Sequence, residues 1–422
     1  MRASEPELVR ARRLVRSHTL AAETADDVVA LARDGNAFAA ELYRVLCFAP
    51  GNLLFSPFSI SRALAMVHLG ARGETAAEMA RVLGFALPRE RLDAGQEALL
   101  RIVGESAGPE GRRAHELAIA NGVWVATGEA PREEFVLGVR RCHGGSVEVA
   151  DFRGDPEGSR RAINGWVYER TRGRITDLIP PRGIDPRERL VLANAVYFKG
   201  RWAQPFDPGR TRKLPFYTGG QSYAVPMMHQ VDSFGYAEDA GVQVVEIPYR
   251  GHALSAVIVL PQEIDGLPAL ERELDWPMLQ RWVEQVRPRS VALTLPKFKL
   301  SSQFALAERL AGMGMRKAFD PAAADLSGIL GKPNDLFVDI VSPGTGRTAL
   351  ECRARAALAV LARRPERASC TPRTNSPRLA SPLVRSPARG ERSGPRLCTA
   401  GTCPLRGYLP PGSRRSRISF RA

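Results

Sequence analysis

Cysteine and histidine are scarce in this sequence, which contains six of each among 422 residues. Only Cys47 and Cys142 lie before residue 342, so a disulfide-held scaffold is excluded for that part of the chain. Cys398 and Cys403 lack the paired spacing of a zinc site, and no two histidines are four residues apart. The sequence therefore predicts neither a metal centre nor a cofactor.

Long apolar runs are also lacking. No stretch of about 18 apolar residues is free of charges, so the sequence predicts no membrane span and no membrane partner. The basic residues near the start, from Arg2 to Arg13, are not followed by an apolar run of signal-peptide length. These two absences predict a cytoplasmic protein.

Acidic residues are nearly missing from the last part of the chain. Residues 342–422 contain 17 arginines, no lysine, no aspartate and three glutamates, whereas the whole chain has a net charge of +15. The basic character thus belongs to this tail, and the remainder is close to neutral. The tail has few aromatic residues, only Tyr408 and Phe420, so we predict no specific nucleic-acid partner. Nonspecific binding of nucleic acid by the tail stays an alternative.

Periodic patterns along the rest of the chain predict helices first and strands later. A helix is expected over residues 27–47 with an interruption near Gly35, and Ser56-Pro57 predicts the start of a second. Thr75 and Glu78 have the spacing of a capping box, followed by Gly84 as a helix stop. Apolar or alternating runs then predict strands over 117–125, 190–198, 242–247, 254–260 and 291–295. This order favours an α+β fold.

One motif points to an enzyme. Residues 104–108 read GESAG and fit the G-x-S-x-G nucleophile elbow of α/β-hydrolases, which would make Ser106 the nucleophile of an esterase. The elbow requires a helix directly after the serine, but Pro109 and Gly111 follow. We therefore expect a loop between a helix and the strand at Leu117, and keep the hydrolase as an alternative.

Short motifs of the chain, taken in order, resemble those of the serpins. The most specific is LANAVYFKGRW at residues 192–202, and NLLFSPFSI at 52–60 comes before it. The others are LGARGET at 69–75, ANGVWV at 120–125, INGWV at 163–167, TRGRI at 171–175, VPMM at 225–228, LPKF at 295–298 and ADLSGI at 324–329. The resemblance extends over residues 27–341.

The resemblance implies a serpin-like α+β fold, with N-terminal helices, a large mixed main sheet and smaller sheets. It also implies suicide inhibition of serine or cysteine endopeptidases, without any catalytic residue. In that mechanism the protease forms its acyl-enzyme on an exposed bait loop. The loop then inserts into the main sheet and distorts the protease, driven by released strain. Because many serpins are secreted, an extracellular location is the alternative to the cytoplasm.

The resemblance also assigns roles to four residues. Ser56, Ser59 and Asn194 match a cluster that gates separation of the main-sheet strands, in which the serines hydrogen-bond to the asparagine. Ser56 fits a plain helix N-cap equally well, and one residue can do both. Trp202 matches the place where the loop first enters the sheet, and it also fits an ordinary core aromatic.

The family pattern stops at Val341. A serpin continues with His-Lys-Ala-Phe, a Glu-Glu-Gly hinge, the bait bond and two closing strands, whereas this chain continues Ser342-Pro343-Gly344. We therefore expect that the gating histidine, hinge, reactive loop and C-terminal strands are missing and that inhibition is lost. The tail composition is typical of out-of-frame translation of GC-rich DNA, with a genuine appended tail as the alternative. The predicted organisation is a loose lead-in at 1–26, a serpin-like domain at 27–341 and a tail at 342–422.

The tail generates the first testable prediction. Beyond Pro365 its arginine, proline and serine residues cannot bury enough apolar surface to offset the entropy of an ordered chain. Amide hydrogens across residues 376–412 should therefore exchange at the rate of an unstructured peptide. Slow exchange in that window, measured by mass spectrometry on the intact chain, would contradict the prediction.

Overall fold

The computed structural model describes residues 22–48, 52–105, 115–173, 175–218, 221–239, 241–298, 306–333 and 336–338, which fall in the same structural unit. The helices are α2 (Ala22–Leu46), α3 (Pro57–Gly70), α4 (Gly73–Leu83), α5 (Arg89–Glu105), α6 (Glu133–His143), α7 (Pro156–Arg170), α8 (Leu267–Glu273), α9 (Trp276–Gln285), α10 (Leu306–Gly312) and α11 (Ser327–Leu330). Single 3-10 turns are η1 (Pro208–Arg210) and η2 (Lys317–Phe319). The strands are β1 (His115–Ala126), β2 (Ser146–Ala150), β3 (Leu190–Gly200), β4 (Arg212–Thr218), β5 (Gln221–Asp239), β6 (Val242–Pro248), β7 (Ser255–Pro261) and β8 (Arg287–Pro296).

The helix starts and stops follow local signals in two cases and depart from them in a third. Pro57 opens α3 as predicted, and Gly84 ends α4 in the left-handed conformation with φ of +73°. The expected interruption at Gly35 is wrong, because α2 runs through it without a break. Its apolar stripe, which includes the buried Phe38 and Leu42, supplies packing that outweighs the low helix propensity of one glycine.

The predicted capping box at Thr75 and Glu78 is also wrong. Helix α4 begins earlier, at Gly73, and has no side-chain cap. The Thr75 hydroxyl instead accepts a hydrogen bond from the backbone N–H of Asp325 at 3.0 Å. Glu78 accepts the N–H groups of Arg316 and Lys317 at 2.7 and 2.8 Å. Both side chains thus join α4 to a segment about 240 residues later, where they satisfy donors that local helix geometry leaves open.

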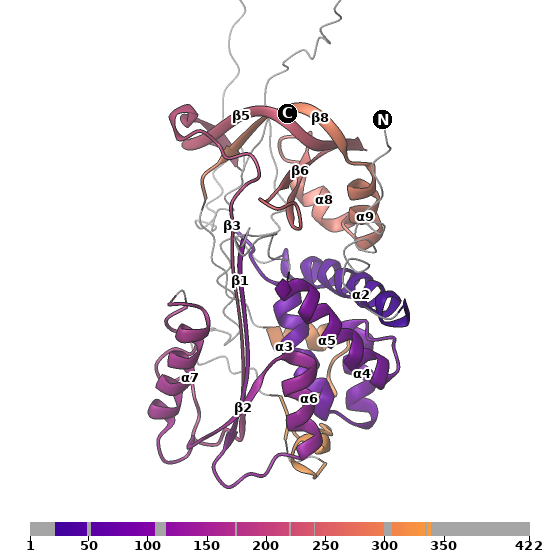
Figure 1. Ribbon diagram of the computed structural model, residues 1–422, viewed down its shortest axis with the longest axis vertical. Coiled ribbons are helices and arrows are strands. Elements are labelled where there is room, and N and C mark those ends of the chain that lie inside the picture. Colours follow the sequence, from indigo (N-terminus) through magenta and orange to yellow (C-terminus); the bar gives the residue numbers. More distant parts are fainter. Residues whose placement is uncertain are drawn as a thin grey trace, which may run out of the picture. The chain divides into compact units, whose positions relative to one another are not determined.

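The first sheet has the strand order β2-β1-β3, with β1 parallel to β2 and antiparallel to β3. Side chains alternate across it with period two. Val123 and Val125 of β1 point to the helices α3, α4 and α6, while Trp124 packs with Ile163 and Val167 of α7. Figure 1 shows the result as three layers, with α7 on one side of the strands and the N-terminal helices on the other.

The second sheet is entirely antiparallel in its described pairs. Its order is β4-β5-β6-β7, and the long strand β5 also pairs with β8 along Met227–Tyr236. Helices α8 and α9 cover one part of it, because Leu270 and Trp282 are buried against Val244 and Val259. One mixed sheet with helices and one antiparallel sheet confirm the predicted α+β class.

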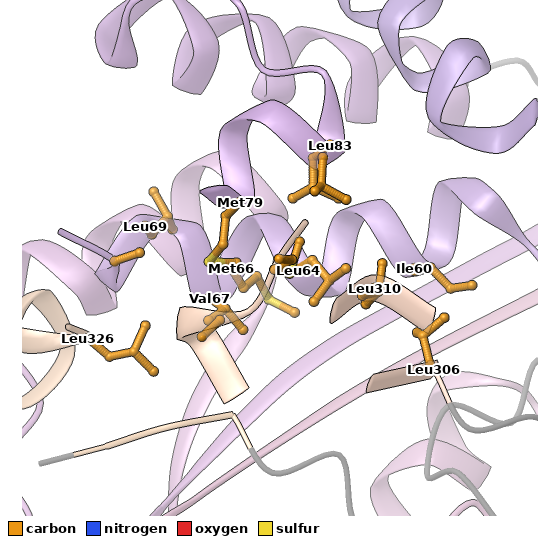
Figure 2. Packing of buried hydrophobic residues seen from close by; sticks show 14 of the residues in the cluster. Ile60, Leu64, Met66, Val67, Leu69, Met79, Leu83, Leu306, Leu310 and Leu326 are labelled. Atoms are coloured by element: carbon orange, nitrogen blue, oxygen red, sulfur yellow. The ribbon is translucent and has the colours of Figure 1, made fainter. Parts of the chain in front are cut away.

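The largest hydrophobic cluster joins the start of the described chain to its end. Figure 2 shows Met66 and Leu64 of α3 close to Met79 and Leu83 of α4, with Leu310 of α10 against them. The cluster therefore holds the N-terminal helices together by means of residues from the far end of the domain. The predicted C-terminal strand loss and the tail concern residues that lie outside the described part of the chain.

Leu83 generates a prediction about this core. Its side chain is completely buried, so Leu83→Ala should lower the free energy of unfolding by about 2–5 kcal/mol through lost burial and the cavity left behind. Leu137→Ala on α6 is the matched control, because 55% of that leucine is exposed and the change should stay within about 0.5 kcal/mol. Urea unfolding followed by circular dichroism measures both. Equal losses for the two variants would contradict the packing described.

Candidate functional site

The candidate site begins at the first turn of α3. Ser56 has extended backbone angles, with φ of −112° and ψ of 101°, and its side-chain oxygen accepts a hydrogen bond from the N–H of Ser59 at 3.2 Å. This is the geometry of an N-cap, which satisfies one of the free donors at a helix start. The cap fixes the first turn and so fixes where the side chain of Ser59 lies.

A run of buried side-chain hydrogen bonds starts at Ser59. Its hydroxyl donates to Oδ1 of Asn194 on β3. Nδ2 of Asn194 donates to Oδ1 of Asn121 on β1 at 2.6 Å, and Nδ2 of Asn121 donates to the backbone carbonyl of His143 at 2.8 Å. We call Ser59, Asn194, Asn121 and this carbonyl the polar network. It connects α3, both long strands of the first sheet and the end of α6.

Burial makes the polar network energetically important. Ser59 is 0% exposed, Asn194 2% and Asn121 3%. An amide or hydroxyl that loses its partner in such surroundings costs about 1–3 kcal/mol, because water cannot replace the bond. The strands can therefore shift over α3 and α6 only if several such bonds break together.

The structure brings together two of the three residues that the sequence assigned to the cluster. Ser59 bonds directly to Asn194, whereas the oxygen of Ser56 is used in the helix cap. Asn121 was not predicted as a member. It is directly opposite Asn194 in the strand register and shares the core face with Val123 and Val125. An asparagine at the core-facing parity of an apolar strand is the signal that could have revealed it.

Trp202 lies just beyond β3, apart from the polar network. Its ring stacks on Tyr249 with centroids 4.5 Å apart and planes within 10°, and the two residues also form a β-bridge. Phe198 packs edge-on against the same tyrosine at 5.1 Å. Burial raises the pKa of Tyr249 to about 12, so the ring stays neutral. Trp202 thus joins the end of the first sheet to the second by an aromatic stack.

The titratable groups beside the polar network are held in defined charge states by burial. The imidazole of His143 is buried, and its pKa is lowered well below 6.5 by desolvation first and by Arg62 and His68 second. Desolvation likewise raises the pKa of the Cys142 thiol to about 11. Ser59 is hydrogen-bonded to an amide and not to a base, so this arrangement can hold elements together but has no activated nucleophile.

Within the described ranges, no three His, Cys, Asp or Glu side chains gather as a metal ion would require. None of the described helices combines the length and apolarity that a membrane crossing needs. Ser106 lies outside the described residues. The neighbouring elements are helix α5 before it and strand β1 after it, which is the reverse of the order that a nucleophile elbow needs.

Comparison with known proteins decides the family. A family model described as Serpin (serine protease inhibitor) matches residues 33–344, a span that contains the polar network and Trp202. The chain belongs to the serpin family. The description of the family is that of serine protease inhibitors, not of catalysts.

The relatives come from distant organisms. A serpin-like protein of Thermococcus kodakarensis is 38% identical and covers 72% of this chain and 70% of its own length. The leukocyte elastase inhibitor of Xenopus tropicalis is 36% identical, with 69% and 78% covered. Antithrombin-III of Ovis aries is 34% identical, with 73% and 68% covered. The resemblance predicted from the sequence motifs is confirmed.

Solved structures agree with this assignment. Ovalbumin from emu (Dromaius novaehollandiae) superimposes with a TM-score of 0.67 at 28% identity, covering 71% of this chain and 81% of its own. A highly specific serpin of the insect Tenebrio molitor gives 0.64 at 31% identity, covering 73% and 82%. The serpin fold predicted for this chain is therefore confirmed.

His143 generates a prediction about pH. Because the pKa of His143 is lowered in the folded serpin, its imidazole stays neutral in the folded state. In the unfolded state the same imidazole binds a proton below about pH 6.5. Stability should therefore fall as the pH falls below 6.5, with a share from His143 that approaches about 1.4 kcal/mol per pH unit. His143→Phe removes that share, so its curve should fall less steeply between pH 6.5 and 5.

Urea unfolding of both proteins at half-unit steps from pH 8 to 5 measures the difference. The interval from pH 8 to 7 is the internal control, since His143 is mostly neutral in both states there and the two curves should run nearly parallel. His68→Phe tests a second, half-buried histidine in the same way, because partial burial lowers the pKa of His68 to about 4. Curves for wild type and His143→Phe that stay parallel down to pH 5 would contradict the prediction.

Proposed function

We propose that this serpin-family chain keeps the gate of the main sheet, which is the first sheet, β2-β1-β3, but does not trap proteases. The gate is the contact between Ser59 on α3 and Asn194 on β3, extended by Asn121 to the end of α6. Serine endopeptidases cleave the chain as an ordinary substrate. The observation that carries the proposal is that the family pattern ends where the hinge and bait loop should begin.

The polar network supports the first half of the proposal. Covalent trapping by a serpin requires that the loop insert as a new strand, and the strands must slide over the helices to admit it. Here the helices hold the strands through Ser59 and through the carbonyl of His143. Both anchors are buried and directional, which are the properties that a gate needs. Ser56 contributes by capping α3 and so orienting Ser59.

The sequence after Val341 supports the second half. The family match ends at residue 344, while the chain continues to residue 422. A mobile hinge of Glu-Glu-Gly type is not found in that continuation, where Ser342-Pro343-Gly344 begins an arginine-rich stretch. Among the described strands, β3 pairs with β1 on one side and forms the edge of the sheet on the other. An inserted loop would have to pair at such an edge, and no segment with the family's hinge is present to supply it.

Without insertion of the loop, the protease completes the hydrolysis of the peptide bond. A protease that cleaves after an arginine forms an ester between its serine and the arginine carbonyl and releases the amine of the next residue. Water then attacks the ester, the peptide leaves with a new carboxylate, and the protease serine regains its proton. Only a rapid strand insertion that distorts the enzyme prevents this second step. The 17 arginines of residues 342–422 therefore present cleavage sites without a trap.

A protease panel tests the proposal. Purified chain mixed with trypsin-like and elastase-like enzymes should show cleavage in the arginine-rich tail, no SDS-stable complex and undiminished protease activity after digestion. Denaturing gels and residual activity against a chromogenic substrate are the two readouts. An SDS-stable band near the summed masses, with stoichiometric loss of activity, would show that a tail bond does work as bait.

Two controls make the outcome specific. An inhibitory serpin run in parallel must give the covalent band, which proves that the conditions permit trapping. The same chain mixed with protease whose active-site serine was chemically blocked must stay uncut, which assigns any cleavage to that serine.

A further inference from the structure

Arg62 is the most deeply buried cation among the described residues. It lies on α3, three residues after Ser59, and its side chain is 1% exposed. Arginine is rarely buried so completely unless a carboxylate pairs with it. In the described part of the chain, however, no acidic side chain forms an ion pair with Arg62. The cation must be stabilised in another way.

Backbone carbonyls and one amide take the place of a counter-ion. One guanidinium nitrogen of Arg62 donates to the carbonyl of Gln96 on α5 at 3.1 Å and also to its side-chain oxygen. The other terminal nitrogen donates to the carbonyl of Cys142 at 2.9 Å. The ring of Phe58 lies 5.9 Å from the guanidinium carbon, within the range of a cation–π contact. One side chain thereby connects α3, α5 and α6.

The carbonyl of Cys142 is a favourable partner because of its place in α6. The last carbonyls of a helix lack partners within the helix and carry the negative end of its dipole. In α6 the carbonyls of Val139 and Arg140 are satisfied by the N–H groups of Gly145 and Gly144. The carbonyls of the last two residues of α6, Cys142 and His143, accept hydrogen bonds from Arg62 and Asn121 respectively.

These bonds close a ring. From α3, Ser59 reaches Asn194 on β3, Asn194 reaches Asn121 on β1, and Asn121 reaches the carbonyl of His143. The adjacent carbonyl of Cys142 returns to α3 through Arg62. Because Ser59 and Arg62 are one turn apart on the same helix, they share a face of α3.

We propose that Arg62 is a positioning residue that holds the two helix anchors of the main sheet, Ser59 on α3 and the carbonyl of His143 on α6, at a fixed spacing. It does not touch the strands itself. It determines how easily β1 and β3 separate from the helices. The strands are held only while both anchors stay within hydrogen-bonding distance of Asn194 and Asn121. The inference rests on the gate proposed above.

Amide hydrogen exchange tests this positioning role. In Arg62→Met the volume is nearly kept but the bonds to α5 and α6 are lost. Exchange in β1 around Asn121 and in β3 around Asn194 should speed up by about tenfold or more, as the loss of charge-assisted hydrogen bonds predicts. Exchange in β6 and β7 of the second sheet should change only in line with global stability.

A control must separate positioning from ordinary loss of packing. Leu64→Ala lies on the same helix and removes a buried side chain that is 3% exposed, without breaking the ring. Compared at equal free energy of unfolding, in urea if necessary, Arg62→Met should exchange faster than Leu64→Ala in β1 and β3 only. Equal rates in the two variants would overturn the inference and leave Arg62 as a structural core residue.

Two further variants cover the remaining outcomes. Arg62→Lys keeps a charge but not the two-armed fork, so it should give an intermediate acceleration. If Arg62→Met does not fold, this variant decides, and wild-type exchange rates in it would overturn the inference. In the double variant Arg62→Met with Ser59→Ala, the second substitution should speed exchange in β1 and β3 only slightly beyond the first, because the ring is already broken. If the accelerations of the two single variants multiply in the double variant, the ring is contradicted.

The Ser59→Ala variant alone distinguishes the two proposals. Unchanged exchange in β1 and β3 would count against the gate itself. Acceleration in Ser59→Ala without any in Arg62→Met would remove only the inference on Arg62. Neither measurement involves a protease, so the trapping assay stays independent of both.

Discussion

The side chains of Asn121 and Asn194 are buried and hydrogen-bonded, and their need for partners fixes how the main sheet of the protein sits on its helices. Apolar packing alone would let β1 and β3 slide over α3, because hydrophobic contacts have little directionality. The side-chain amides of Asn121 and Asn194 remove that freedom. Each has one partner on the other strand and one on a helix, so only one register satisfies both. The polar network lowers stability if some of its hydrogen bonds are missing. When all of them are formed, it specifies the position of the sheet.

The ends of helices supply much of the bonding that joins distant segments. The last carbonyls of α6 accept bonds from Arg62 and Asn121. Glu78 and Thr75, on α4, accept the free N–H groups of a segment that includes Lys317 and Asp325. In each case, a group that regular secondary structure leaves unpaired is satisfied by a side chain from another element. The N-terminal helices and the segment near residue 320, which these bonds join, also share one hydrophobic cluster.

The serpin family combines a sheet that can open with contacts that keep it closed. In this chain the contacts that we propose as the gate lie inside the family match, which ends at residue 344. The opening would depend on sequence beyond that point, where the family pattern is not found. The proposed gate and the reactive loop that the family resemblance implies are thus separable in sequence, because one is made of core side chains and the other of an exposed segment. If the proposed function is right, a change confined to the end of the chain abolishes trapping while the described packing persists.

The amino-acid sequence by itself was enough for the α+β class, the serpin resemblance, the start of α3 at Pro57 and the end of α4 at Gly84. These features depend on periodicity, on ordered motifs or on residues whose backbone preferences are local. It was also enough to nominate Ser59 and Asn194. Only the tertiary structure decided that the Ser56 oxygen accepts the helix-cap hydrogen bond, that Thr75 and Glu78 bond to another segment, and that Asn121 and Arg62 complete the ring through the end of α6. The reason is physical: a hydrogen-bonding side chain has several possible partners, and which one it takes depends on what folding brings within 3 Å of it.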